Sequence, residues 1–142
     1  MIALTPDLLT NVPEIDEQHK ELFNHLSATE LIGTAPLTKE EIEETLEFLG
    51  AYVVKHFADE EKLMLESGYP KFDWHHTWHQ GYIAECKKMK EEYATNGLSE
   101  QFADKLNESI VRWYIKHVRT VDVALGKHIN NHRMLKNRLD PK

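Results

Sequence analysis

The sequence predicts an all-α protein that folds as an up-down-up-down antiparallel four-helix bundle with a short N-terminal arm and a C-terminal tail. Helix breakers are few and regularly spaced, apolar residues recur in steps of three and four, and no stretch shows sustained period-two alternation. Four helices with short connections pack most simply in alternating directions. We expect one domain over residues 1–142, with a core of about 12–122 and a tail of 123–142.

Each predicted helix is bounded by a capping residue, a proline or a glycine. The N-terminal boundaries are marked, in order, by Asn11 with Pro13, Thr38 with Glu41, Pro70, and Ser99. The C-terminal boundaries of the first three helices are marked by Gly33 with Pro36, Gly68 with Pro70, and Asn96 with Gly97. Proline suits a first turn, glycine suits the position after a last turn, and Thr38 with Glu41 has capping-box spacing. The fourth helix should reach at least Thr120.

Polar residues interrupt the apolar stripe that each helix should turn toward the bundle interior. Steps alternating between three and four residues define this stripe. Its members are Ile15, His19, Leu22 and Leu26; Ile42, Leu46, Leu49, Val53, His56, Glu60 and Leu63; Phe72, His75, His79, Tyr82, Cys86, Met89 and Tyr93; and Phe102, Leu106, Ile110, Trp113 and His117. Five histidines and one glutamate are therefore predicted to face the core, whereas His76 lies off the stripe.

These six polar residues cannot all be buried without partners. An unsatisfied buried polar group costs roughly 1–3 kcal/mol, and a charged group costs more. The sum would be comparable with the whole stability of a domain of this size. A single histidine on an apolar face is more often an ordinary core residue than a ligand, but a set spread over four helices needs a shared partner. We therefore predict a metal centre in the bundle interior.

The donor types restrict the metal. Imidazole and carboxylate without thiolate suit iron, zinc, copper or nickel, and argue against calcium and magnesium. Five imidazoles and two carboxylates are too many for one tetrahedral zinc, but they fit two six-coordinate metals that share carboxylate bridges. We assign the second carboxylate to Asp122, five residues after His117. Because five residues advance about 500° on an α-helix, Asp122 would face the site only if the helix ends or distorts there.

Composition excludes several other classes of protein. The chain has 142 residues, of which 41% are hydrophobic and 29% are charged, as in ordinary globular domains. Its formal net charge of -7 argues against nucleic acid or an anionic membrane as the main partner. The single cysteine, Cys86, excludes an internal disulfide and is predicted to be inert core. With no signal-peptide pattern and no apolar stretch of the roughly 20 residues that a membrane span needs, we expect a cytoplasmic location.

Four motifs give the sequence a resemblance to a known family. They are IDEQHKELF around His19, HFADE from His56 to Glu60, HHTWH from His75 to His79, and WYIKHVRTVD from Trp113 to Asp122. In their order and helical spacing they resemble the hemerythrin family, specifically its single-domain bacterial members, the bacteriohemerythrins. The resemblance runs from about Ile15 to Asp122, which is most of the chain.

The resemblance implies a cofactor and a ligand set. It implies two iron ions, bridged by carboxylates and by a solvent-derived oxo or hydroxo group, with one position left open for reversible binding of dioxygen. Carried over motif by motif, the ligands of one iron are His75, His79 and His117. The ligands of the other are His19 and His56, and the carboxylates that bridge the pair are Glu60 and Asp122.

Residues beside these ligands are predicted to wall an oxygen pocket. They are Phe57, Trp113, Tyr114 and Val118. Tyr114 stands three residues before His117, where the resemblance leads us to expect leucine. Its phenol can either keep its hydroxyl in water or reach the open iron position and donate a hydrogen bond to the ligand there. His25, His128 and His132 lie off the stripe or in the polar tail and are predicted to be solvated.

Three functions are compatible with such a centre. The leading hypothesis is a non-enzymatic protein that binds dioxygen reversibly, for transport, storage, delivery or sensing. The alternative is a di-iron enzyme, namely a peroxidase, an oxidase or a nitric oxide scavenger, and Tyr114 is the feature that would favour it. The third is a metal-handling protein without gas chemistry. The expected small partners are therefore dioxygen, nitric oxide or peroxide, and no protein partner follows from the sequence.

Overall fold

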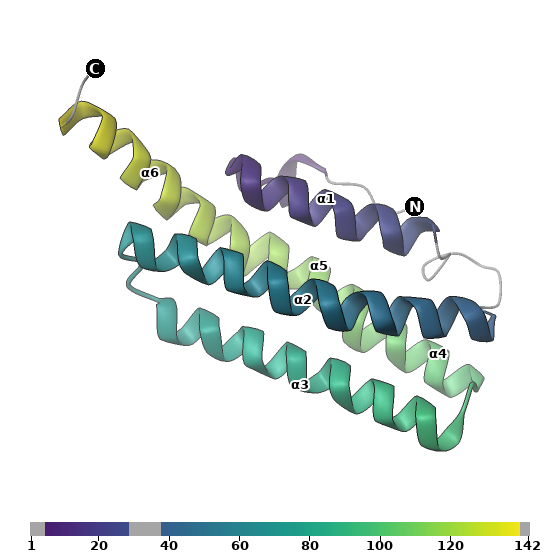
Figure 1. Ribbon diagram of the computed structural model, residues 1–142. Coiled ribbons are helices and arrows are strands. Elements are labelled where there is room, and N and C mark those ends of the chain that lie inside the picture. Colours follow the sequence, from purple (N-terminus) through teal and green to yellow (C-terminus); the bar gives the residue numbers. More distant parts are fainter. Residues whose placement is uncertain (1–4, 29–37, 140–142) are drawn as a thin grey trace.

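Four helical segments lie side by side in the computed structural model, which describes residues 5–28 and 38–139 (Figure 1). After a short 3-10 turn η1 (Pro6–Leu8), the first three segments are α1 (Pro13–Ala28), α2 (Lys39–Ser67) and α3 (Phe72–Asn96). The fourth is continuous and comprises α4 (Glu100–Leu106), the π-helical turn η2 (Asn107–Arg112), α5 (Trp113–His117), the π-helical turn η3 (Val118–Asp122) and α6 (Val123–Leu139). Successive segments run in opposite directions, and the described residues include no strand (Figure 1). The predicted all-α antiparallel bundle is confirmed.

The helix ends follow from the residues that were expected to cap them. Thr38 Oγ1 accepts a hydrogen bond from the backbone N–H of Glu41 at 3.1 Å, and the Glu41 carboxylate accepts one from the Thr38 N–H at 3.3 Å. α2 ends at Gly68, whose φ of 63° lies in the left-handed region that glycine adopts without strain. Ser99 caps α4 by accepting a hydrogen bond from the Phe102 N–H at 3.0 Å. The predicted breakers Gly33 and Pro36, and the side chains of Leu26 and Ile110, lie outside the described residues.

The start of α1 is held by the carboxylate of Asp16, a residue that the sequence analysis did not single out. Asp16 Oδ1 accepts hydrogen bonds from the Thr10 N–H at 2.8 Å and the Thr10 hydroxyl at 2.7 Å. Its Oδ2 accepts a third bond from the N–H of Asn11 at 3.0 Å, and Asn11 adopts a left-handed φ of 61°. Pro13 follows as the first residue of α1. These bonds tie the N-terminal arm to the bundle.

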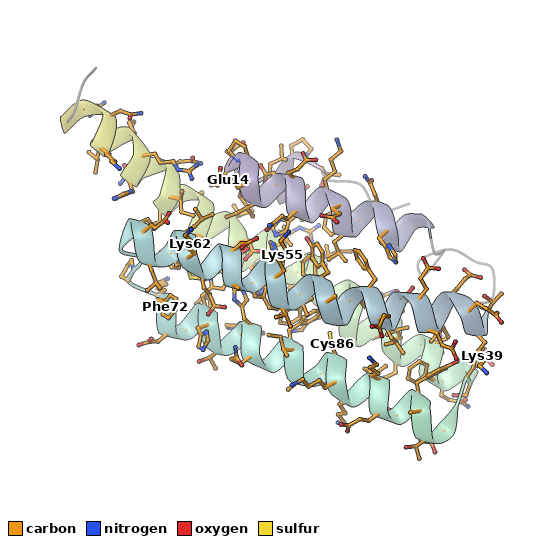
Figure 2. The ribbon with its side chains drawn as sticks, in the orientation of Figure 1. Glu14, Lys39, Lys55, Lys62, Phe72 and Cys86 are labelled. Atoms are coloured by element: carbon orange, nitrogen blue, oxygen red, sulfur yellow. The ribbon has the colours of Figure 1, made fainter. Side chains whose placement is uncertain are left out.

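The bundle interior contains a polar layer between two apolar layers. Figure 2 draws the side chains that the helices carry. One apolar layer includes Leu22, Phe23, Ile42, Leu49, Tyr82, Leu106 and Tyr114. The other includes Val12, Ile15, Met64, Tyr69, Leu125 and Ile129. The buried histidines lie between them along every helix, so that α2, for example, passes from Val53 through His56 and Glu60 to Met64. The layers exclude water from the polar residues on both sides.

The segment expected as a C-terminal tail is helical over its described part and packs against the bundle. In α6, Leu125 and Ile129 are buried against residues of α1 and α2. His128, which was predicted to be solvated, is half-buried and donates from Nε2 to the Ser67 carbonyl at 2.8 Å. That prediction was wrong because the many polar residues of this segment hide the apolar pair Leu125 and Ile129, which has helical spacing. Packing of this pair brings His128 against the bundle.

Candidate metal centre

Helices α1 and α2 bring three of the predicted ligands together. His19 comes from α1, and His56 and Glu60 lie one turn apart on α2, so both α2 side chains share a face. His56 Nε2 lies 3.2 Å from Glu60 Oε2, and His19 Nε2 lies 4.0 Å from the same oxygen. All three side chains are at most 1% exposed. His19, His56 and Glu60 therefore place polar groups at positions where the stripe pattern alone would predict apolar side chains.

Helices α3 and α5 contribute the other three imidazoles. His75 and His79 lie one turn apart on α3, and both place Nε2 near Glu60 Oε1, at 2.9 Å and 3.2 Å. His117 comes from the last residue of α5 and is 3% exposed. Its ring lies 5.2 Å from the ring of His75, measured between centroids. Glu60 thus faces imidazoles from three helices, α1, α2 and α3.

Asp122 reaches the cluster because the fourth helix is distorted. Its residue range Val118–Asp122 forms a π turn, closed by a hydrogen bond from the N–H of Val123 to the carbonyl of Val118. This five-residue bond places residues five apart on the same side of the helix, which a regular α-helix does not do. Asp122 Oδ1 consequently lies 3.1 Å from Nε2 of both His117 and His75, and its Oδ2 lies 3.0 Å from Nε2 of His19.

The seven side chains fall into two overlapping groups. Within each group, the potential ligand atoms all lie within 4.8 Å of one another. The larger group comprises Glu60, His75, His79, His117 and Asp122. The smaller comprises His19, His56, Glu60 and Asp122. Both carboxylates belong to both groups, and every member is buried. The arrangement has the form of two adjacent cation sites with shared carboxylate ligands.

The contact geometry fits metal ligation better than a hydrogen-bond network. Ten buried atoms of the cluster form no aligned hydrogen bond with any described residue, and three of them are Nδ1 of His19, His75 and His117. The other seven lie within 4.0 Å of an imidazole or carboxylate of another member. They are Nε2 of His19, His56, His75 and His117, Oε2 of Glu60, and both carboxylate oxygens of Asp122. Unsatisfied buried atoms cost roughly 1–3 kcal/mol each. Lone pairs that converge on shared points can all be satisfied by cations, so these residues fit a metal centre.

Burial and charge act in opposite directions on the two carboxylates. Burial raises the pKa of Glu60, but the imidazoles around it outweigh this effect and leave the pKa well below its ordinary value. Burial likewise raises the pKa of Asp122, and the nearby imidazoles, His117 above all, hold it well below the usual range. For His75, burial lowers the pKa, yet Asp122 and Glu60 raise it to about 9. Both carboxylates are therefore anionic at neutral pH, and the cluster attracts cations.

Two further residues orient the imidazoles from behind. Gln18 Oε1 lies 2.6 Å from His56 Nδ1, and Gln18 Nε2 donates to Asp59 Oδ2 at 2.8 Å. Glu61 Oε2 lies 3.1 Å from His79 Nδ1. Each oxygen accepts a hydrogen bond from the Nδ1–H and so directs the Nε2 lone pair into the cluster. The sequence did not predict this role for Gln18 or Glu61, because the histidine that each one contacts lies on another helix. The only signal in the sequence was that each stands next to a predicted ligand, His19 or Glu60.

Three of the four predicted pocket residues, Phe57, Trp113 and Tyr114, lie against the imidazoles. Phe57 stacks on His79 with ring centroids 3.9 Å apart, and Trp113 stacks on His117 at 4.9 Å. Val118 is fully buried. Tyr114 is 0% exposed, which excludes the alternative in which its hydroxyl reaches water.

The remaining singled-out residues lie outside the cluster. His25 is half-buried and stacks on Phe48, with ring centroids 3.7 Å apart, so its predicted solvation is wrong. His76 is half-buried and pairs with Glu61. Cys86 is buried, and burial raises the pKa of its thiol to about 12, which keeps it protonated. In the described segments, no helix combines the length and the apolar character needed to cross a membrane.

An antiparallel helical bundle with a buried cluster of five imidazoles and two carboxylates defines a bundle-type metal-binding protein. The sequence model described as "Hemerythrin HHE cation binding domain" matches residues 10–128. This match covers most of the chain, and the chain belongs to the hemerythrin family.

Similar proteins agree with this assignment, and solved structures agree with the fold. The chain is 31% identical over 135 residues to a bacteriohemerythrin of Stenotrophomonas maltophilia (strain R551-3), covering 93% of this chain and 84% of that protein. It is 30% identical over 130 residues to a bacteriohemerythrin of Campylobacter jejuni subsp. jejuni serotype O:23/36 (strain 81-176), covering 90% of each. A crystal structure of wild-type hemerythrin superposes with a TM-score of 0.75 at 24% identity, covering 91% of this chain and 98% of that one. A hemerythrin variant with tyrosine in place of a leucine superposes equally well, at 25% identity over 91% and 97% of the two chains.

Proposed function

We propose that the cluster holds two iron ions and that the protein binds dioxygen reversibly, for its transport, storage, delivery or sensing. The observation that carries the proposal is the division of seven buried side chains into two overlapping groups that share Glu60 and Asp122. Two metals bridged by these carboxylates, one with three imidazoles and the other with two, would satisfy every member. Membership of the hemerythrin family supports iron over zinc, copper or nickel.

The donor set favours binding over turnover. Ferritin-like di-iron enzymes surround their metals mainly with carboxylates, whose negative charge stabilises oxidised iron. Here five imidazoles, which are neutral as metal ligands, replace most of that charge and favour the ferrous state. When bound, the iron pair would supply the electrons for reversible binding of dioxygen. The chain supplies fixed imidazoles, two bridging carboxylates, and apolar layers that keep water and stray protons away from the ligand.

Tyr114 provides the observation that favours a second function. Its buried hydroxyl forms no aligned hydrogen bond with any described residue, and its ring meets the ring of His19 edge-on at 5.9 Å. A proton donor beside the centre would assist reactions in which the ligand is protonated. The second candidate is therefore a di-iron enzyme of the peroxidase, oxidase or nitric oxide scavenging type that uses the same cluster.

An optical titration separates the two functions. The protein is loaded with iron, reduced anaerobically, exposed to air and then stripped with argon, while iron is counted per chain. Two irons per chain and a visible absorption band that appears in air and disappears under argon would support the oxygen binder. A spectrum that argon does not reverse would exclude reversible binding and would leave the enzyme, tested next by turnover of peroxide and nitric oxide.

A further inference from the structure

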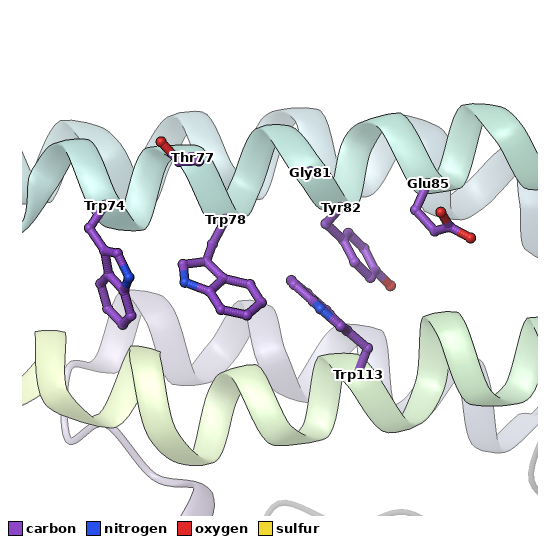
Figure 3. Close-up of a pocket in the computed structure, with 7 residues that line it drawn as sticks. All are labelled: Trp74, Thr77, Trp78, Gly81, Tyr82, Glu85 and Trp113. Atoms are coloured by element: carbon purple, nitrogen blue, oxygen red, sulfur yellow. The ribbon is translucent and has the colours of Figure 1, made fainter.

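All three tryptophans of the chain gather in one place, between α3 and α5 (Figure 3). Trp74 and Trp78 project from α3 and remain 49% and 41% exposed, and Trp113 projects from α5 toward them. The rings of Trp78 and Trp113 lie 5.8 Å apart, and those of Trp74 and Trp78 lie 6.3 Å apart, measured between centroids. Exposed aromatic residues collected in one patch are typical of a binding surface.

A groove of about 610 Å³ opens between these indoles. Gly81 on α3 has no atom within 4 Å of the position a Cβ would take, so this part of the wall is open. A second hollow of about 310 Å³ continues along Trp78 and Trp113 to His117 and Lys116. Together they have the size of a site for a small molecule, for which roughly 300–1,000 Å³ is typical.

The indoles connect the groove to the metal centre by direct ring contact. Trp113 stacks on His117 with an interplanar angle of 10° and a centroid separation of 4.9 Å. Trp78, which faces solvent, lies 5.8 Å from Trp113 and 6.4 Å from His117. Electron tunnelling slows steeply with distance, so rings in contact provide a short path from the surface to a ligand of the centre.

Charges at the two ends of the groove indicate which molecule would fit. Glu85 stands at one end (Figure 3), and its charge also acts on the nearby Lys105. Lys71 places Nζ 5.9 Å from the ring of Trp74 at the opposite end, and Lys116 lines the adjoining hollow. The complementary ligand is a flat aromatic molecule with a hydrogen-bond donor at one end and an anionic group at the other.

We propose that the groove binds a flavin mononucleotide, with its ring among the indoles, its imide N–H toward Glu85 and its phosphate toward the two lysines. Electrons from the reduced flavin then reach the oxidised metal centre through Trp78, Trp113 and His117. One reduced flavin gives up two electrons and two protons; two ferric ions each gain one electron and become ferrous, and the protons pass to solvent. The electron-transfer step rests on the proposed di-iron function, whereas flavin binding does not.

Binding is tested on the metal-loaded, oxidised protein with oxidised flavin mononucleotide, so that no reaction occurs. Stacking on an indole quenches flavin fluorescence, and we expect saturable quenching. Trp78→Leu should weaken binding at least tenfold, while Leu65→Ala, a change at a 67% exposed apolar residue of α2, should leave it unchanged. Lys116→Glu should weaken binding of flavin mononucleotide severalfold but not that of riboflavin, which lacks the phosphate. Absence of saturable quenching, or equal binding by Trp78→Leu, would overturn the proposal.

Electron transfer is tested by anaerobic stopped-flow reduction of the oxidised protein. With reduced flavin mononucleotide, Trp78→Leu should slow reduction at least tenfold, and Trp78→Phe should restore part of the rate. With dithionite, a small non-aromatic reductant, both variants should match the original protein. Equal slowing with both reductants, or no slowing with flavin, would overturn the proposed path.

Other outcomes separate the two proposals. Reversible oxygen binding without flavin binding would overturn only the flavin site. Flavin binding by a protein that holds no iron would overturn the electron-transfer role together with the proposed function. A dimer that Trp78→Leu converts to a monomer, without flavin binding, would assign the groove to an interface between copies of this chain and overturn the flavin site.

Discussion

Single side chains decide what this centre can do with a bound ligand. The chain places a phenol where an aliphatic residue was expected, and the structure encloses it completely: Tyr114 is 0% exposed and contacts the rings of His19, Phe23 and His117. Burial raises its pKa well above the ordinary value, and the nearby carboxylates raise it further. The phenol therefore stays protonated and keeps its O–H as a hydrogen-bond donor.

The Tyr114 hydroxyl should promote irreversible oxidation of the iron-loaded protein by donating a proton to the outgoing ligand. Tyr114→Phe keeps the ring and removes the donor, so autoxidation in air should slow about fivefold, the effect of one hydrogen bond of about 1 kcal/mol. The rate is followed by loss of the oxygenated absorption band. Tyr93→Phe removes a surface hydroxyl that bonds Glu43 and serves as the control. An unchanged rate in Tyr114→Phe would exclude a role for the hydroxyl.

Glu61 should tighten metal binding through His79 without touching the metal. Its carboxylate accepts a hydrogen bond from the Nδ1–H of His79 and thereby fixes the ring, and losing such a partner lowers metal affinity roughly 10–100-fold. Glu61→Ala should therefore lower affinity at least about tenfold in competition with a chromophoric chelator. His76→Ala is the matched control, because His76 bonds the same carboxylate but lies outside the cluster. Equal affinities for the original protein and Glu61→Ala would contradict the orienting role.

At the scale of elements, the fourth helix shows which features a sequence pattern can and cannot give. Steps of three and four residues predict that His117 points into the bundle. The same geometry shows that Asp122 can face the cluster only if the helix ends or is distorted after His117. The π turn Val118–Asp122 supplies that distortion, but no residue in it marks a π turn rather than a helix end. Its presence depends on contacts with other helices, which a local pattern does not contain.

Packing of α6 against the N-terminal arm should depend on one glycine. A Cβ on Gly126 would lie 2.3 Å from the Thr10 carbonyl oxygen, and Thr10 is held in place by Asp16. Gly126→Ala should therefore lower the free energy of unfolding by about 1–3 kcal/mol, measured by urea denaturation. Gly50→Ala is the control: no atom lies within 4 Å of its Cβ position, and alanine in this helix should stabilise by about 0.5–1 kcal/mol. Loss of stability in both variants, or in neither, would contradict this account.

For the whole molecule, the sequence predicts the architecture and the seven-residue cluster better than the contacts between helices. Helical spacing is a local property, so the stripe that carries His56 and Glu60 is visible in one segment. The hydrogen bond from His56 to Gln18 joins residues of different helices, and it could not be predicted from either helix alone. The same limit explains why the packing of α6, with Leu125 buried, was not foreseen.

The polar layer should make the stability of the whole bundle depend on a bound metal. Without a cation, the converging imidazoles and carboxylates remain buried and incompletely paired between two apolar layers, whereas metal at about a thousand times its Kd would stabilise the fold by about 4 kcal/mol. Since 1 kcal/mol corresponds to about 3–5 °C in a domain of this size, a chelator should lower the Tm by about 15 °C in scanning calorimetry. Glu60→Ala, which removes a carboxylate common to both groups, should unfold at a lower temperature and respond much less to the chelator. An unchanged Tm of the original protein after chelator treatment would mean that the buried imidazoles and carboxylates satisfy one another without a cation. A metal centre would then be excluded as the reason for these polar residues.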